Sequence, residues 1–160
     1  MQIPSKARAV IIGGGVIGCS IAYHLGKLGW RDVVLLERKQ LTCGTTWHAA
    51  GLIAQLRATQ NMTRLAKYSQ ALYFGLEAET GVATGFKRNG SITVALTDER
   101  MEELRRSAAM ARAFGVEIDE ITPGDIAGRY PGLATGDVVG GVWLPKDGQA
   151  DPVNITQALA

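Results

Sequence analysis

The chain has 160 residues, of which 46% are apolar, 20% charged and 6% aromatic, and 17 Lys and Arg against 15 Asp and Glu leave a formal charge of +2. Intrinsic disorder requires lower hydrophobicity and a larger net charge, nucleic-acid binding requires a clustered excess of base, and a membrane span requires about 18 unbroken apolar residues. The composition therefore predicts a folded protein with no nucleic-acid partner and no membrane span. Glycine is enriched, at 20 of 160 residues against about 7% on average, which indicates many turns or close backbone approaches.

The first elements along the chain predict a βαβ unit. Residues 9–12 are a short run of apolar, β-favouring residues, and residues 13–18 bring four glycines before a helical stretch that reaches Leu28. Gly29 is the expected end of that helix. Residues 33–36 form a second continuous apolar run, as expected of a strand buried in a parallel sheet.

A loop, a long helix and a hairpin are expected next. No periodicity is visible over residues 44–60, which predicts a loop with at most a short helix. Apolar residues recur at three- and four-residue spacing over residues 62–80, which predicts an amphipathic helix that stops at Gly81. An Asn-Gly pair joins residues 85–88 to the alternating segment 91–96, and this pattern predicts an antiparallel hairpin.

Capping residues mark two further helices. Thr97 can cap a helix with Asp and Glu in its first turn, and this helix is expected to stop at Gly115. Thr122, followed by Pro123 and Asp125, has the spacing of a capping box with proline at the first helical position. A short helix is therefore expected before residue 130.

The last residues predict a strand, a turn and a final helix. The strand covers residues 138–144, the turn lies at Asp147 and Gly148, and Asp151 followed by proline can begin the helix. No stop signal follows within the sequence. The chain is thus expected to be an incomplete piece of a longer protein, with an α/β fold that joins a Rossmann-like βαβ unit to part of an α+β domain containing antiparallel strands.

The glycine motif of residues 13–18 has the features of a dinucleotide-binding turn. Gly13 permits the tight turn after the strand, Gly15 lets the backbone approach a pyrophosphate, and Gly18 lets the helix pack on the strand. Unpaired N–H groups at the helix N-terminus can then bind phosphate. Glu37 lies 19 residues after Gly18, close to the ~20-residue spacing of the acid that binds the ribose hydroxyls. This acid disfavours NADP, because it would repel a 2′-phosphate, and leaves NAD and FAD open.

The segment after the second strand carries a resemblance to a known family. Residues 44–52, Gly-Thr-Thr-Trp-His-Ala-Ala-Gly-Leu, resemble the N-terminal flavin-binding region of the dimethylglycine and sarcosine dehydrogenases. These enzymes belong to the D-amino acid oxidase-like superfamily of FAD enzymes. The resemblance continues through residues 76–81, 88–92, 130–131 and 147–152, and so covers nearly all of the chain.

The resemblance implies FAD as the cofactor and assigns roles to the first 52 residues. Residues 16–17 would lie at the pyrophosphate turn, residues 37–38 at the adenosine ribose and residues 44–52 around the flavin. The family histidine that matches His48 is bonded covalently to the 8α-methyl group of the flavin. His24 lies in the first helix and is expected to be structural. With the glycine motif included, the expected cofactor-binding residues are Gly13, Gly15, Val16, Ile17, Gly18, Glu37, Arg38, Gly44, Thr45, Thr46, Trp47, His48, Ala49, Ala50, Gly51 and Leu52.

The implied function is oxidation of a small N-methyl amino acid such as dimethylglycine or sarcosine, with oxygen or an electron-transfer flavoprotein as electron acceptor. Residues 1–83 would then form the first part of an FAD-binding domain, residues 84–150 part of a substrate domain, and residues 151–160 a helix that returns to the FAD-binding domain. A tetrahydrofolate-binding domain would lie beyond residue 160. The expected compartment is the cytoplasm of a bacterium, or the mitochondrial matrix in a eukaryote.

Two other functions are also compatible with these residues. One is a glycine or D-amino acid oxidase of the same superfamily with noncovalent flavin, and the other is a noncatalytic nucleotide-binding module. No catalytic acid or base and no metal ligand is assigned, and residues 1–160 by themselves are expected to lack activity.

Overall fold

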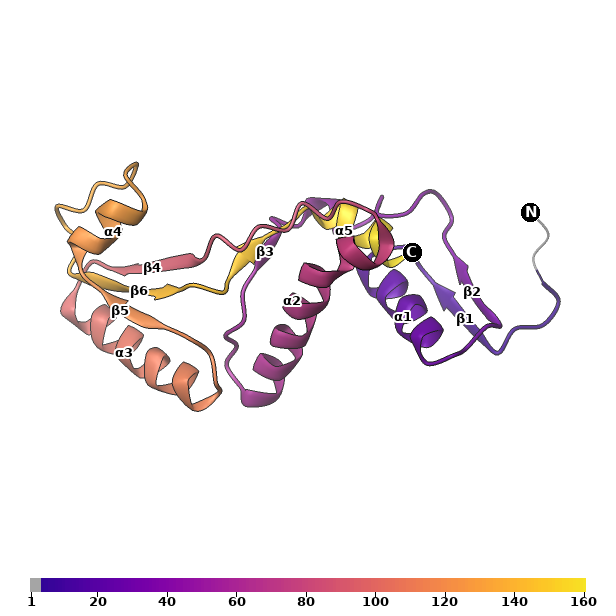
Figure 1. Ribbon diagram of the computed structural model, residues 1–160, viewed down its shortest axis with the longest axis horizontal. Helices are drawn as coiled ribbons and strands as arrows, with labels where there is room; N and C mark the ends of the chain where they lie inside the picture. The colour runs from indigo at the N-terminus through magenta and orange to yellow at the C-terminus, as the bar shows by residue number, and fades with distance from the viewer. Residues whose placement is uncertain (1–3) are drawn as a thin grey trace. The chain divides into compact units, whose positions relative to one another are not determined.

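A computed structural model describes residues 4–160 of the chain (Figure 1). Its fold is mixed α/β with both parallel and antiparallel strand pairs, as expected. The helices are α1 (Val16–Lys27), α2 (Gln60–Thr80), α3 (Asp98–Ala113), α4 (Pro123–Arg129), α5 (Pro152–Leu159) and the 3-10 helix η1 (Thr46–His48). The strands are β1 (Ala9–Ile12), β2 (Val33–Leu36), β3 (Leu52–Ile53), β4 (Ser91–Ala95), β5 (Asp119–Ile121), β6 (Gly140–Leu144) and β7 (Gly148–Gln149).

The chain divides into two compact units. The first contains the chain up to Leu52 together with Leu72–Phe86 and Ala150–Ala160, and the second contains Ile53–Ala71 and Lys87–Gln149. The first domain boundary was expected at residue 83, so the structure differs in placing Ile53–Ala71 with the second unit. Which unit serves FAD and which serves substrate stays a prediction.

Buried contacts explain why residues 53–71 belong to the second unit. Leu56 packs against the main apolar core of that unit. The Gln70 side-chain amide donates a hydrogen bond to the backbone oxygen of Lys146 and accepts one from the amide of Gln55. Both glutamines are almost fully buried, so these bonds satisfy polar groups that would otherwise be costly to bury.

The first unit contains the expected βαβ arrangement. β1 and β2 are parallel, with Ala9 opposite Val33 and Ile12 opposite Leu36, and α1 connects them. α1 packs against both strands and against α5. Gly29, with a φ of +81°, follows the end of α1 in the left-handed conformation that favours glycine.

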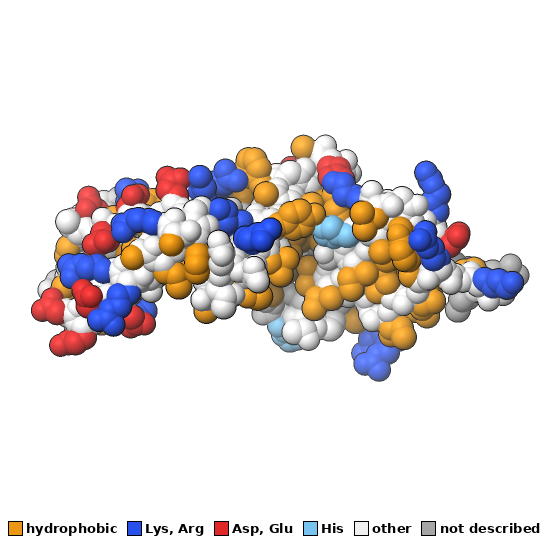
Figure 2. Space-filling view, turned by 90° about the horizontal axis from the view of Figure 1, so that it is seen from below, with side chains coloured by type: hydrophobic (Ala, Val, Ile, Leu, Met, Phe, Trp, Pro, Cys, Tyr) orange, Lys and Arg blue, Asp and Glu red, His pale blue; other side chains and the backbone are white. Residues whose placement is uncertain are grey.

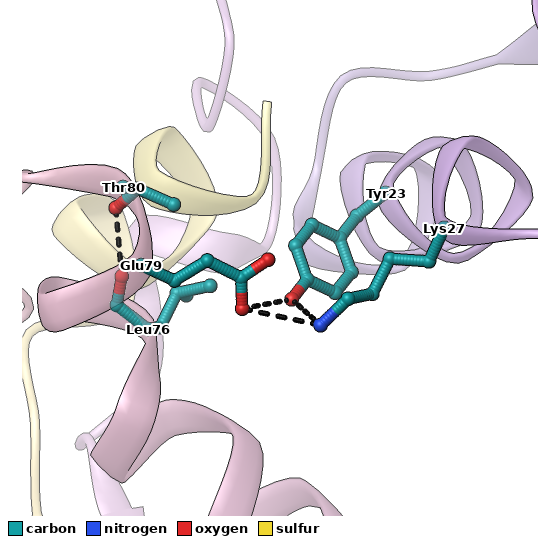
Figure 3. Close-up of polar contacts among 5 residues, drawn as sticks. All are labelled: Tyr23, Lys27, Leu76, Glu79 and Thr80. Carbon is teal, nitrogen blue, oxygen red and sulfur yellow. Dashed lines mark hydrogen bonds and ion pairs between the residues drawn. The ribbon is translucent and has the colours of Figure 1, made fainter.

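Three polar side chains connect α1 to the C-terminal part of α2 (Figure 3). The Tyr23 hydroxyl donates to Oε2 of Glu79 at 2.8 Å, and Nζ of Lys27 donates to the Tyr23 oxygen at 2.8 Å and to Glu79 at 3.1 Å. The hydrogen bond from Tyr23, followed by that from Lys27, lowers the pKa of Glu79. The folded state therefore favours the ionised form of this carboxyl group.

We expect Glu79 to make the stability of the first unit depend on pH. Because the pKa of Glu79 is lower in the folded than in the unfolded chain, its contribution is complete above the unfolded value and is lost as the pH falls through the folded value. Glu79→Gln should therefore lower the urea midpoint at pH 7 and change it less at pH 3. Tyr23→Phe removes one donor and should weaken the same pH dependence. An equal effect of Glu79→Gln at both pH values would contradict this prediction.

The second unit is built on a three-stranded antiparallel sheet in the order β4-β6-β5. Ser91 lies opposite Leu144 in the first pair, and Asp119 lies opposite Trp143 in the second. The main core contains residues of α3, β4 and β6 and two residues of the segment between α3 and β5, namely Ala95, Met101, Leu104, Ala108, Ala111, Val116, Ile118, Val142 and Leu144. A smaller cluster of Ile121, Ile126 and Val138 lies under α4. β3 and β7 form a separate two-stranded sheet.

The predicted hairpin at Asn89 and Gly90 is wrong. β4 pairs with β6, nearly fifty residues later in the chain, and Lys87 forms a bridge with Gln149 instead of pairing with β4. The Gly90 N–H donates to the backbone oxygen of Asp147 at 2.8 Å, so the chain at this point leads into β4 without reversing. Burial of one sheet face against α3 outweighs the local turn preference of the Asn-Gly pair.

The predicted helix caps are confirmed. The Thr97 side chain accepts a hydrogen bond from the backbone N–H of Arg100, and Thr122 and Asp125 form a complete capping box. Oδ1 of Asp151 accepts hydrogen bonds from two N–H groups in the first turn of α5. Within residues 4–160, none of the helices combines the length and the apolar content needed to cross a lipid bilayer.

Candidate dinucleotide-binding site

A cavity of about 520 Å³ lies in the first unit, where β1 ends and α1 begins. Apolar side chains gather on the surface of the region formed by α1, to the right of centre in Figure 2. Ile12 and Ile17, which line the cavity, are 87% and 75% exposed. Ten of the expected cofactor-binding residues line the cavity: Gly13, Gly15, Val16, Ile17, Gly18, Glu37, Gly44, Thr45, Thr46 and Ala49.

The cavity wall also contains three apolar residues that the sequence analysis did not assign. They are Ile11 and Ile12 of β1 and Ile21 of α1. Ile21 lies one helical turn after Ile17, so the spacing of these two residues in α1 could have indicated a shared face. The β1 residues were expected to serve only as a buried strand.

Close backbone packing explains two of the glycines. Gly13 has a φ of +111°, and its N–H donates to the backbone oxygen of Leu36 at 2.8 Å. A Cβ atom on Gly18 would lie 1.9 Å from the backbone oxygen of Gly13. α1 can approach the turn this closely only because Gly18 has no Cβ atom. The backbone oxygen of Gly13 cannot rotate away from a Cβ atom as a flexible side chain could. The N-terminus of α1 is thereby held at the cavity.

Glu37 accepts hydrogen bonds from two backbone N–H groups at the cavity. Oε2 accepts from Gly14 at 2.8 Å, and Oε1 accepts from Lys39 at 3.0 Å. The hydrogen bond from Gly14, followed by that from Lys39, lowers the pKa of Glu37. Glu37 is therefore held against the glycine turn in its ionised form.

Thr46 connects the 44–52 segment to the N-terminus of α1. Its Oγ1 atom accepts a hydrogen bond from the backbone N–H of Val16 at 3.0 Å, and the residue is 9% exposed. The Thr46 side chain thus caps a helix that begins thirty residues earlier in the sequence. Since a hydroxyl both accepts and donates, its proton remains able to donate to a bound group.

The other expected site residues do not line this cavity. They are Arg38, Trp47, His48, Ala50, Gly51 and Leu52. The His48 ring is exposed and packs against the Trp47 ring, with centroids 3.8 Å apart. Gly51 has a backbone role, because a Cβ atom on it would lie 2.2 Å from the backbone oxygen of Ala150. The cavity therefore joins the glycine turn, Glu37 and the first part of the 44–52 segment.

Among residues 4–160 no group of three or more His, Cys, Asp and Glu side chains is placed to hold a metal ion. Cys19 and Cys43 are free thiols. Burial, followed by the nearby charge of Glu37, raises the pKa of the Cys19 thiol. A raised pKa leaves little thiolate at neutral pH, so Cys19 has the properties of a packing residue.

The chain is similar in sequence to two dehydrogenases and to a regulatory subunit. The mouse pyruvate dehydrogenase phosphatase regulatory subunit is 39% identical over 160 residues, which is 100% of this chain and 18% of that protein. Human sarcosine dehydrogenase is 41% identical over 159 residues, 99% of this chain and 17% of that enzyme. Rat dimethylglycine dehydrogenase is 43% identical over 155 residues, 97% of this chain and 18% of that enzyme.

The fold agrees with a solved structure of similar sequence. L-proline dehydrogenase from P. horikoshii superimposes with a TM-score of 0.92 and 32% identity, over 99% of this chain and 41% of that one. The chain spans less than a fifth of the length of the three curated relatives named above. The family model for FAD dependent oxidoreductases, DAO, matches residues 8–160. The chain therefore belongs to the DAO family of FAD-dependent oxidoreductases.

Proposed function

We propose that this chain binds FAD as part of an enzyme that oxidises small N-methyl amino acids. The observation that carries the proposal is a single cavity lined by the glycine turn, Glu37 and residues 44–46. The names of relatives that match over almost the whole chain, sarcosine dehydrogenase and dimethylglycine dehydrogenase, support the substrate class. Bound FAD would supply the acceptor for a hydride from the carbon next to the substrate nitrogen.

The residues around the cavity fit the phosphate and ribose groups of FAD. The N-terminus of α1 carries a partial positive charge, and the absence of Cβ atoms at Gly13 and Gly15 leaves the backbone open to a pyrophosphate. An ionised carboxylate has about four lone-pair sites, and each oxygen of Glu37 accepts a hydrogen bond from a backbone N–H group. The remaining lone pairs can accept hydrogen bonds from the ribose hydroxyls.

We propose His48 as the point of covalent attachment to the flavin. An imidazole nitrogen is a nucleophile of the required type, and the side chain is exposed on the same short segment as the cavity residues Thr45 and Thr46. Its packing against the Trp47 ring restricts the orientations of the imidazole. Residues 44–46 would then bind FAD while His48 retains it.

Acid denaturation of the FAD-loaded protein tests the attachment. Flavin absorbance should remain with the wild-type polypeptide after precipitation in acid, and should be released completely from His48→Ala. His24→Ala is the matched control, because His24 lies within α1 and its Nδ1 atom is 2.6 Å from the backbone oxygen of Ser20. Release of all flavin from the wild-type protein would refute covalent attachment while leaving FAD binding intact.

A second candidate function is a flavin-binding regulatory subunit without turnover. It is favoured by the 39% identity with the mouse pyruvate dehydrogenase phosphatase regulatory subunit. Anaerobic mixing of the complete natural protein with sarcosine, dimethylglycine or glycine separates the candidates. Bleaching of the flavin by the N-methylated compounds supports the proposed enzyme, and bleaching by glycine alone supports a glycine oxidase. No bleaching by any of the three supports the regulatory function.

A further inference from the structure

A second cavity, of about 480 Å³, lies wholly within the second unit, and none of its lining residues also lines the FAD cavity. It lies beside β4, β6 and the end of α4. Four apolar residues form much of its wall, namely Ile92, Val94, Leu133 and Trp143, and all of them pack against the small core under α4. Asn89, Arg129 and Tyr130 add polar groups to the same wall.

The Trp143 ring is held in a fixed place in this wall. Gly90 has a φ of +73°, and a Cβ atom on it would lie 1.8 Å from the indole ring. The guanidinium carbon of Arg129 lies 4.9 Å from the centroid of the same ring. Contact with the Gly90 backbone and the attraction of a cation for an aromatic ring therefore set the shape of the cavity before any ligand arrives.

The polar groups of the wall are available to a ligand. Within residues 4–160 the Arg129 guanidinium forms no ion pair, and the side chains of Asn89 and Tyr130 form no hydrogen bond. Asp125 lies one helical turn before Arg129, and the hydrogen bonds from Thr122, followed by the charge of Arg129, lower the pKa of its carboxyl group, but the two side chains form no ion pair. The cavity therefore combines apolar walls with one cation that has no ion-pair partner, and two polar side chains that form no hydrogen bond, within the described residues.

We infer that this cavity binds a small monocarboxylate with an apolar body. The carboxylate pairs with the Arg129 guanidinium, whose planar set of N–H donors matches two carboxylate oxygens. The apolar body lies against Ile92, Val94 and Leu133. An apolar pocket with a few convergent polar groups is the usual form of a small-molecule site, and the volume lies within the usual range of about 300–1,000 Å³.

Fluorine NMR with 4-fluorophenylacetate tests this inference on the full chain. The probe should bind saturably to the wild type. Arg129→Gln should weaken binding at least tenfold. Arg112→Gln is the matched control. Arg112 is a partly exposed arginine on α3 of the same unit, and it pairs with Glu120 on β5. It should leave the affinity for the probe unchanged.

Two further measurements keep the inference falsifiable if a variant folds poorly. The neutral isostere 4-fluorophenylacetamide should bind the wild type at least tenfold more weakly than the carboxylate. Leu133→Trp fills part of the cavity and should abolish binding while the far-ultraviolet circular dichroism is unchanged. Equal binding of the carboxylate and the amide, or equal binding by Arg129→Gln and wild type, would overturn the proposed site, as would the absence of saturable binding.

Discussion

Gly18→Ala is expected to abolish FAD binding and to destabilise the first unit by about 3 kcal/mol or more, at the upper end of the range for overpacking. The added Cβ atom would lie 1.9 Å from the backbone oxygen of Gly13, so α1 must move away from the turn. That movement would displace the N-terminal N–H groups of α1 and open the cavity. Because the clash is with backbone, no change of rotamer can relieve it.

Gly26→Ala is the matched control for this prediction. Gly26 lies in the same helix, and a Cβ atom on it would have no neighbour within 4 Å. Alanine is favoured over glycine in a helix, so this substitution should stabilise the chain by about 0.5–1 kcal/mol. FAD affinity from flavin fluorescence titration, and urea unfolding of both variants, measure the two effects. Wild-type affinity in Gly18→Ala would show that the turn does not hold the cofactor.

Local sequence patterns were sufficient to predict the elements whose stabilising contacts lie between residues close together in the sequence. α3 and α4 begin directly after Thr97 and Thr122, whose hydroxyls accept hydrogen bonds from the backbone N–H groups three residues later. The β1-α1-β2 unit was predicted for a similar reason, since its strands pair across a single connecting helix. By contrast, β4 finds its partner in β6, and an Asn-Gly pair beside β4 cannot indicate a strand so far along the chain.

The same distinction applies to the candidate FAD cavity. The spacing from Gly18 to Glu37 predicted that the acid lies near the glycine turn, because both ends of one βαβ unit are brought together by the parallel strand pair. The hydrogen bond from the Val16 N–H to Thr46 could not be predicted in this way. It depends on how residues 40–46 return to α1 after β2, and no sequence pattern fixes the path of a loop.

A similar distant contact underlies the role of Asp147, which the sequence indicates only as a turn residue. Its carboxylate is 3% exposed. Oδ1 accepts a hydrogen bond from the backbone N–H of Gln55 at 2.9 Å, and Oδ2 accepts one from the Ser91 hydroxyl at 2.7 Å. One buried side chain thus joins the segment after β3 to the start of β4, two parts of the second unit that are far apart in sequence.

Asp147→Ala should therefore destabilise the second unit by about 2–4 kcal/mol, because it leaves the buried N–H of Gln55 and the Ser91 hydroxyl without acceptors, at about 1–3 kcal/mol for each unsatisfied group. Asp147→Asn keeps a carbonyl acceptor and should cost about half as much. Asp137→Ala, at an exposed aspartate in the loop before β6, should change stability by less than about 0.5 kcal/mol. Hydrogen exchange of the β4 and β6 amides reports on this unit directly. Exchange should be slowest in Asp137→Ala, faster in Asp147→Asn and fastest in Asp147→Ala. If Asp147→Ala exchanged no faster than Asp137→Ala, the two hydrogen bonds would not stabilise the sheet, and the register of β4 would have to depend on apolar packing against α3 alone.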